Sequence, residues 1–227
     1  IHFLFGDHQG GQQTQGIGTS GQSQQTLVHQ LVFQFSVGHP LYADTDHQSL
    51  NAEAFEYALA QLAAQAGLTY EEYVASLDLL DAEEIASVAD QLNAPVAGEA
   101  YINAKLPFGY NYIDEDLDVV HINDGQGEHG SHVAGIATAN AYIPTDDGFV
   151  PALESAMVQG VAPEAQLITM KVFGKAGGAY DSDYMAAIED AIVLGCDSAN
   201  LSLGSGSPGT SRNATEKYQA IMESLTE

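Results

Sequence analysis

The stretch "QLITMKVFGKAGGAYDSDYMAAIEDAIVLGCDSANLSL", residues 166–203, decides the predicted fold. It opens with a continuous apolar run over 166–174, the pattern of a strand that is buried on both faces of a parallel sheet. A Gly-rich loop follows, then an amphipathic helix over 182–195 and a second strand over 198–203. Strand, helix and strand with short links form a crossover, the unit of a doubly wound sheet. We therefore predict an α/β fold with a parallel sheet and helices on both faces.

Upstream of this unit, residues 50–95 predict an acidic helical insertion. Asn51 can cap the helix that follows it, in which Phe55, Leu59 and Leu62 recur at helical spacing. Two further helices begin with residue pairs at capping-box spacing, where each side chain satisfies the free amide of the other. These pairs are Thr69 with Glu72 and Asp81 with Glu84. The outer faces of all three helices are acidic, as expected of a solvated insertion.

Three segments lie between the insertion and the crossover unit. "KLPFGYNYID", residues 105–114, is short, aromatic and broken by Pro107 and Gly109, so it predicts a strand and a turn. Residues 129–140 predict a helix, and residues 141–155 predict a loop.

The composition excludes several classes of function. The chain has 31 acidic and 5 basic residues, a formal charge of -26, and would therefore repel the phosphates of nucleic acids. Its single cysteine, Cys196, permits neither an internal disulfide nor a multi-cysteine zinc site. No stretch approaches the 18 or more apolar residues of a membrane span. Such acidity suits a secreted or surface-displayed protein as well as a halotolerant one.

Residues 1–43 differ in composition from the rest of the chain. They contain no Lys, Arg or Glu and are rich in Gln, Gly and His. One interpretation is a polar leader with a strand near 27–35; another is a reading-frame error or a misassembled gene end. The start also lacks a signal peptide and an initiator Met, so we expect an internal fragment.

Two histidines lie three residues apart in "GQGEHGSHVAGIATAN", residues 125–140. A zinc site would need a third ligand, and the H-E-x-x-H order of a zinc protease is absent. The pair can also be purely structural. Alternatively, His129 is a general base, because the positive end of a helix dipole disfavours imidazolium and a base must be neutral. Three glycines leave this histidine approachable; they are Gly125, Gly127 and Gly130.

"HGSHVAGI" resembles the histidine signature of the subtilisin-like serine peptidases. The resemblance implies that His129 is the general base and that His132 belongs only to the helix. "GVAPEAQLITMKVF" (160–173) resembles the strand after this helix, and "NLSLGSG" (200–206) resembles the family's substrate-binding strand. An extended peptide would pair there with an exposed strand edge. The residues that this implies for substrate binding are Ser202, Leu203 and Gly204.

Within this family, the closest likeness is to the lactocepin-type cell-envelope proteinases, large multidomain enzymes of bacterial surfaces. "KLPFGYNYID" and the acidic insertion ahead of the histidine signature are similar to that subgroup, and the resemblance covers residues 44–227. We therefore divide the chain into an atypical Gln/Gly-rich leader, 1–43, and a partial peptidase domain, 44–227, that contains the insertion 50–95. The resemblance implies an extracellular protein, secreted or attached to the cell wall.

The family's mechanism uses an Asp to orient the histidine, a Ser to attack the carbonyl and an Asn to help hold the oxyanion. The Gly-Thr-Ser-Met-like motif of the nucleophile and the oxyanion Asn are expected beyond Glu227, and Asn200 is not that Asn. The family's Asp-Ser/Thr-Gly triplet is absent upstream of the histidine signature, where the Asp is expected near Pro40. Asp44 and Asp46 are poor substitutes.

We therefore expect a serine endopeptidase that cleaves polypeptide through an acyl-enzyme, without a metal or other cofactor. The 227-residue chain alone is expected to be inactive, because only His129 of the triad is present. The alternative is a noncatalytic pseudopeptidase, or a peptide-binding or adhesion module. A metalloenzyme that uses His129 and His132 is a distant third. The oligomeric state stays open.

Overall fold

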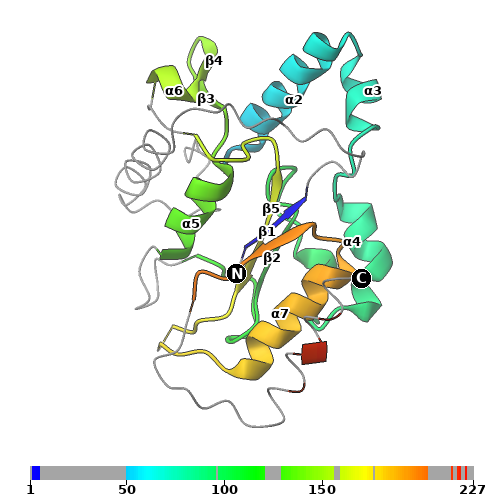
Figure 1. Cartoon of the computed structure of the whole chain (residues 1–227), viewed down its shortest axis with the longest axis vertical. Helices are drawn as coiled ribbons and strands as arrows, with labels where there is room; N and C mark the ends of the chain where they lie inside the picture. Colours follow the sequence, from blue (N-terminus) through cyan, green and yellow to red (C-terminus); the bar gives the residue numbers. More distant parts are fainter. Residues whose placement is uncertain are drawn as a thin grey trace.

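A computed structural model describes residues 2–5, 50–95, 97–120, 129–155, 159–175 and 177–203, together with residues 216, 219, 220 and 223. A sheet lies in the middle of these described residues, and helices pack around it (Figure 1). The helices of the core are α5 (His129–Thr138), α4 (Ala82–Val88) and α7 (Asp181–Val193). At one end of the molecule lies α2 (Ala52–Ala66), which is followed by α3 (Tyr70–Val74).

Four strands form the main sheet in the order β2-β5-β1-β6. They are β2 (Phe108–Asn111), β5 (Gln166–Lys171), β1 (His2–Phe5) and β6 (Ser198–Asn200). β2 and β5 pair in parallel, with Phe108 opposite Ile168. β1 pairs antiparallel with both β5 and β6, so those two strands are parallel to each other and α7 joins them. The predicted strand–helix–strand crossover is therefore confirmed.

The antiparallel strand β1 was not predicted. The crossover from β5 to β6 skips one position of the sheet, and "HFLF" occupies it by pairing with both strands. Pairing on both edges satisfies the backbone groups of a strand that lies between two others. The other residues of 1–43 lie outside the described residues, including the strand expected near 27–35.

Helices cover both faces of the sheet, as predicted. Alternate residues of β5 point to opposite faces. Leu167 belongs to a small cluster with Ala134 of α5. Ile168 and Met170 belong to the larger core that includes α7 and α4. Five of the six residues of β5 are buried, which explains its continuous apolar pattern.

The three predicted helix starts are confirmed. The Asn51 side chain accepts a hydrogen bond from the amide of Ala54 at 2.8 Å. Both capping boxes form, with reciprocal bonds between side chain and backbone. Short 3-10 turns follow at Ala89–Gln91 and Ala97–Glu99.

The prediction of a loop over 141–155 was wrong. This segment forms a hairpin of β3 (Tyr142–Thr145) and β4 (Gly148–Pro151), followed by the short helix α6 (Ala152–Ser155). Gly148, with φ at 120°, supports the turn in a conformation that favours glycine. Tyr57 of α2 stacks on Phe149, with ring centroids 4.5 Å apart, and meets the Tyr142 ring edge-on. Aromatic packing from a distant helix thus stabilises strands that the local pattern does not indicate.

The insertion contributes to the core as well as to the surface. Phe55 and Leu59 of α2 are buried, and Ile85 of α4 is buried in the core shared with β2 and α7.

The division of the chain into a leader, an insertion and a partial peptidase domain stays a prediction. Among the described helices, none has the length and apolar character needed to cross a bilayer.

Candidate functional site

The predicted site residues meet at the edge of the sheet where its parallel strands end. β2, β5 and β6 end at Asn111, Lys171 and Asn200, and chains that follow parallel strands emerge at the same edge. His129 is the first residue of α5, and Ser202 lies in the extended segment directly after β6. This is the edge at which open α/β sheets commonly bind ligands.

A hydrogen bond joins the predicted base to the predicted substrate strand. Nε2 of His129 lies 2.7 Å from the main-chain oxygen of Ser202, although 73 positions separate the two residues in the sequence. Both residues are exposed. A carbonyl oxygen can only accept, so the imidazole donates through Nε2–H.

The segment after β6 is anchored on both sides. The Ser202 hydroxyl donates to Oδ1 of Asn200 at 2.7 Å, as expected for side chains two apart on one face of an extended strand. Leu203 is half-buried and packs against the core around α7. Gly204, the third predicted substrate-binding residue, lies outside the described residues.

An apolar hollow of about 330 Å³ adjoins this contact. It separates α5 from the segment after β6, and residues 161–162 close its side. The lining residues are Val133, Ile136, Ala137, Val161, Ala162, Asn200 and Ser202. Sequence reasoning missed this hollow, although the apolar positions of α5 already have helical spacing.

The wall at residues 160–162 is held by the backbone of α5. The amides of Gly160, Val161 and Ala162 donate to carbonyl oxygens near the end of that helix, at 2.8 to 3.0 Å. A Cβ on Gly160 would lie 2.4 Å from the Ala139 nitrogen, so only glycine fits here without a shift of the backbone.

Neither a metal site at His129 nor a carboxylate bound to its imidazole is found among the described residues. His132 lies one turn further along α5 and is half-buried. Within the described ranges, no group of three or more His, Cys, Asp or Glu residues could hold a metal ion. The hydrogen bonds of the described residues include none between His129 and a carboxylate. Asp44, Asp46 and the glycines before His129 lie outside these residues.

A polar network lies at the ends of β2 and β5. The buried Asn111 amide donates to Asp114 and Asp116, each at 3.1 Å, and to the Asp118 carbonyl at 3.0 Å. Nζ of Lys175, from the Gly-rich loop, lies 3.5 Å from Asp116 and 3.6 Å from Asp118. Asp116 is the main cause of a raised pKa of Lys175. The acidic residues at 114–118 are therefore already bound by Asn111 and Lys175 of the same chain. The sequence analysis did not predict this network.

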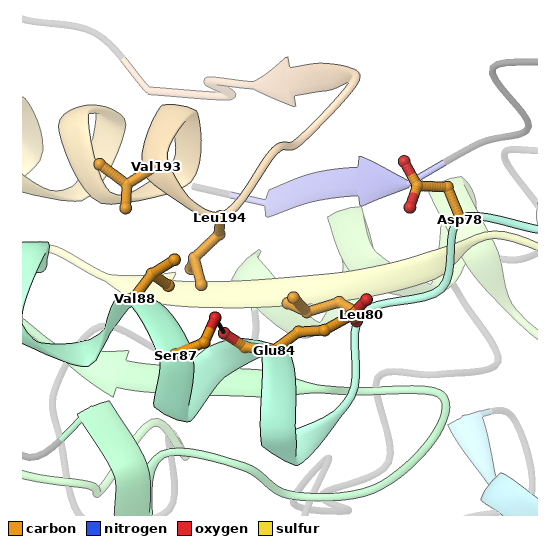
Figure 2. A pocket seen from close by; sticks show the side chains of 7 residues that line it. All are labelled: Asp78, Leu80, Glu84, Ser87, Val88, Val193 and Leu194. Carbon is orange, nitrogen blue, oxygen red and sulfur yellow. Dashed lines mark hydrogen bonds between the residues drawn. The ribbon is translucent and has the colours of Figure 1, made fainter.

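A second pocket, of about 140 Å³, lies between α4 and the end of α7 (Figure 2). Glu84 on its wall already accepts the amide of Asp81 at 2.9 Å, and the Ser87 hydroxyl donates to the Glu84 carbonyl at 2.7 Å. These contacts belong to the cap and the first turns of α4. The polar side chains Glu84 and Ser87 on the pocket wall thus have a structural role in α4 and do not by themselves indicate a ligand.

Comparison with known proteins matches most of the chain to one family model. The model described as "Subtilase family" matches residues 36–226. The PI-type proteinase of Lactococcus lactis subsp. cremoris is 43% identical over 110 residues, which are 47% of this chain and 5% of that protein. The minor extracellular protease Vpr of Bacillus subtilis (strain 168) is 36% identical over 101 residues, 42% of this chain and 11% of that protein.

A third relative, the C5a peptidase of Streptococcus pyogenes serotype M6, is 33% identical over 105 residues, 46% of this chain and 8% of that protein. The chain thus covers a small part of the length of each of these relatives. No solved structure gave a significant match.

Proposed function

Because the chain belongs to the subtilase family, we propose that its parent protein is a serine endopeptidase that cleaves extended polypeptide through an acyl-enzyme. The predicted resemblance to subtilisin-like serine peptidases of the lactocepin type is confirmed by the family match and by the similarity to the PI-type proteinase. In this proposal, His129 is the general base, and Ser202, Leu203 and Gly204 hold the substrate.

The observation that supports these roles is the 2.7 Å contact between Nε2 of His129 and the main chain of Ser202. A base must reach the proton of the nucleophile that attacks the scissile carbonyl, while the strand edge holds the peptide, so the base and the edge must be neighbours. Both residues are exposed and accessible to a macromolecular substrate.

The test is an activity assay on the complete product of the gene from which this chain comes. We expect cleavage of an unfolded polypeptide such as casein, and a loss of kcat by about 10⁴-fold or more in His129→Ala. His132→Ala is the matched control, because it removes the same group one turn along the same helix. Full activity of His129→Ala would refute the proposed role.

We propose that the 227-residue chain alone is inactive, because it offers a base and a strand edge without a residue that matches the family's nucleophile motif. A fluorophosphonate probe labels activated serines and is expected to leave this polypeptide unlabelled. Labelling would contradict this expectation.

The second candidate is a noncatalytic peptide-binding protein. It is favoured by one observation of the sequence, which has no Asp-Ser/Thr-Gly triplet upstream of the histidine signature. Binding without cleavage by the complete gene product would support this candidate over the peptidase.

We also propose that the protein acts outside the cell, secreted or attached to the wall. The support is its charge of -26, its single cysteine and its similarity to a protease named as extracellular. Detection of the protein only in the cytoplasmic fraction of its host would refute this location.

A further inference from the structure

The hydrogen bond between His129 and Ser202 engages both halves of the proposed site at once. A general base needs a free lone pair on the nitrogen that takes the proton. Here Nε2 of His129 donates a hydrogen atom to the Ser202 oxygen, 2.7 Å away. In this tautomer, the Nε2 lone pair is not available.

The same contact engages the strand edge. A peptide that adds to an exposed edge does so by pairing its N–H groups with main-chain carbonyls. The Ser202 carbonyl, the first such acceptor on the proposed edge, already accepts from His129. A peptide N–H and the imidazole N–H therefore compete for one oxygen.

We propose that the hydrogen bond from His129 Nε2 to the Ser202 oxygen is a latch that an extended peptide opens. The peptide N–H replaces the imidazole at the Ser202 carbonyl. The neutral imidazole then loses the proton on Nε2 to water and regains one on Nδ1, so its charge does not change while the Nε2 lone pair becomes free. This inference rests on the proposed function, because it takes the edge at Ser202 as the peptide site.

The surroundings make His129 the movable partner. The acceptor is fixed, because the Ser202 hydroxyl donates to Asn200 and Leu203 packs into the core. His129 is exposed at the first residue of its helix. The apolar hollow that Ser202 helps to line lies beside the contact. Release thus costs about one net hydrogen bond to an exposed group, and the peptide restores it at the carbonyl.

The first test reads the tautomer of His129 by ¹⁵N NMR of the 227-residue chain at about pH 9, where histidine side chains are neutral. The His129 signals are assigned by their loss in His129→Ala. We expect Nε2–H in the free chain and a change to Nδ1–H on saturation with an acetylated, amidated Ala-Val hexapeptide. An Nδ1–H tautomer in the free chain would overturn the latch.

The second test measures the affinity of the same hexapeptide. His129→Ala removes the competitor and leaves the Ser202 carbonyl, so we expect binding to tighten by about fivefold. His132→Ala is the matched control and is expected to leave the affinity unchanged. Circular dichroism confirms that both variants are folded. Equal affinity of wild type and His129→Ala would refute the latch.

The outcomes separate the latch from the function on which it rests. Peptide binding with an unchanged His129 tautomer refutes the latch and leaves the peptide edge intact. No binding to the wild type or to His129→Ala refutes the peptide edge, and the latch with it. Tighter binding to His129→Ala together with the tautomer change supports both.

Discussion

Two regions of the molecule each bury a charged side chain, and they hold it in different ways. Asp190 lies where α7 meets β2 and the segment after α4, whereas Lys105 lies beneath α2, beside the segment that supports α5. Both side chains are 0% exposed. Neither forms an ion pair with another residue in the described part of the chain, so hydrogen bonds must offset the cost of burial.

Asp190 has a full set of donors. Its oxygens accept from the Asn93 amide at 2.7 Å, the Asn93 side chain at 2.9 Å, the Ala94 amide at 3.0 Å and the Tyr112 hydroxyl at 2.7 Å. Burial, and then Asp190 itself, raises the pKa of the Tyr112 hydroxyl, which therefore stays a donor. One carboxylate thus fastens the end of the insertion to α7 and to the sheet.

Lys105 is less completely compensated. Its Nζ donates to the carbonyl oxygens of Pro163 and Ala165, each at 2.7 Å, and lies 4.9 Å from the centroid of the Phe55 ring. Burial lowers the pKa of Lys105 to about 7, and Glu164 offsets only part of this effect. The difference teaches that a buried charge held by two carbonyl oxygens, on the side of the molecule that supports α5, is expected to titrate near neutral pH.

The largest expected effect is at Asp190. Asp190→Ala leaves four donors without their acceptor in a buried site and is expected to lower the free energy of unfolding by about 4 kcal/mol. Asp190→Asn keeps one acceptor and should cost about half as much. Glu189→Ala, at an exposed neighbour that accepts one bond at 3.3 Å, is the control. Urea unfolding followed by circular dichroism measures all three; a small loss in Asp190→Ala would contradict this account.

The next effect is at Gly160, beside the Lys105 region. A Cβ there would lie 2.4 Å from the Ala139 nitrogen and 2.6 Å from two backbone atoms of Thr138. These are backbone atoms, which cannot move aside as a flexible side chain can. Gly160→Ala is therefore expected to lower the free energy of unfolding, measured with urea, by about 3 kcal/mol. Gly98→Ala is the matched control, since its Cβ would meet nothing within 4 Å. Similar stabilities of the two variants would show that the close approach is not real.

The titration of Lys105 predicts a smaller effect that depends on pH. With a native pKa of about 7 against 10.5 in the unfolded chain, only the unfolded chain holds the proton between these values. The free energy of unfolding therefore rises with pH in this window, by about 2 kcal/mol from pH 7 to pH 9. Below the native pKa, both states hold the proton and the destabilisation by Lys105 has reached its full size. Lys105→Met lacks this titration. The difference between the two stability profiles isolates the effect, and parallel profiles would exclude it.

The smallest effect is expected for an exposed charge. Lys175 lies 3.5 and 3.6 Å from two carboxylates and is exposed to solvent, which screens such pairs. Lys175→Ala is expected to leave the midpoint of urea unfolding unchanged, at both low and high salt. A loss of stability that persists in 1 M NaCl would show that this loop is held by more than surface charge.

Local patterns explain which elements could be predicted. The cap residues Asn51, Thr69 and Asp81 act on amides two or three residues away, so their effect is visible in the sequence. The apolar run of β5 reflects burial on both faces. By contrast, the hairpin at 142–151 depends on Tyr57, a residue of another helix, and no local pattern could reveal it.

By itself, the sequence determined the helices with caps, the crossover around α7 and the family, because each depends on neighbouring residues or on short motifs. Only the tertiary structure decided that β1 pairs antiparallel between β5 and β6, and that Asp190 and Lys105 are buried with hydrogen-bond partners. It also brought His129 to the Ser202 carbonyl across 73 positions. The physical reason is that pairing, burial and charge compensation depend on groups that meet only when distant segments pack together.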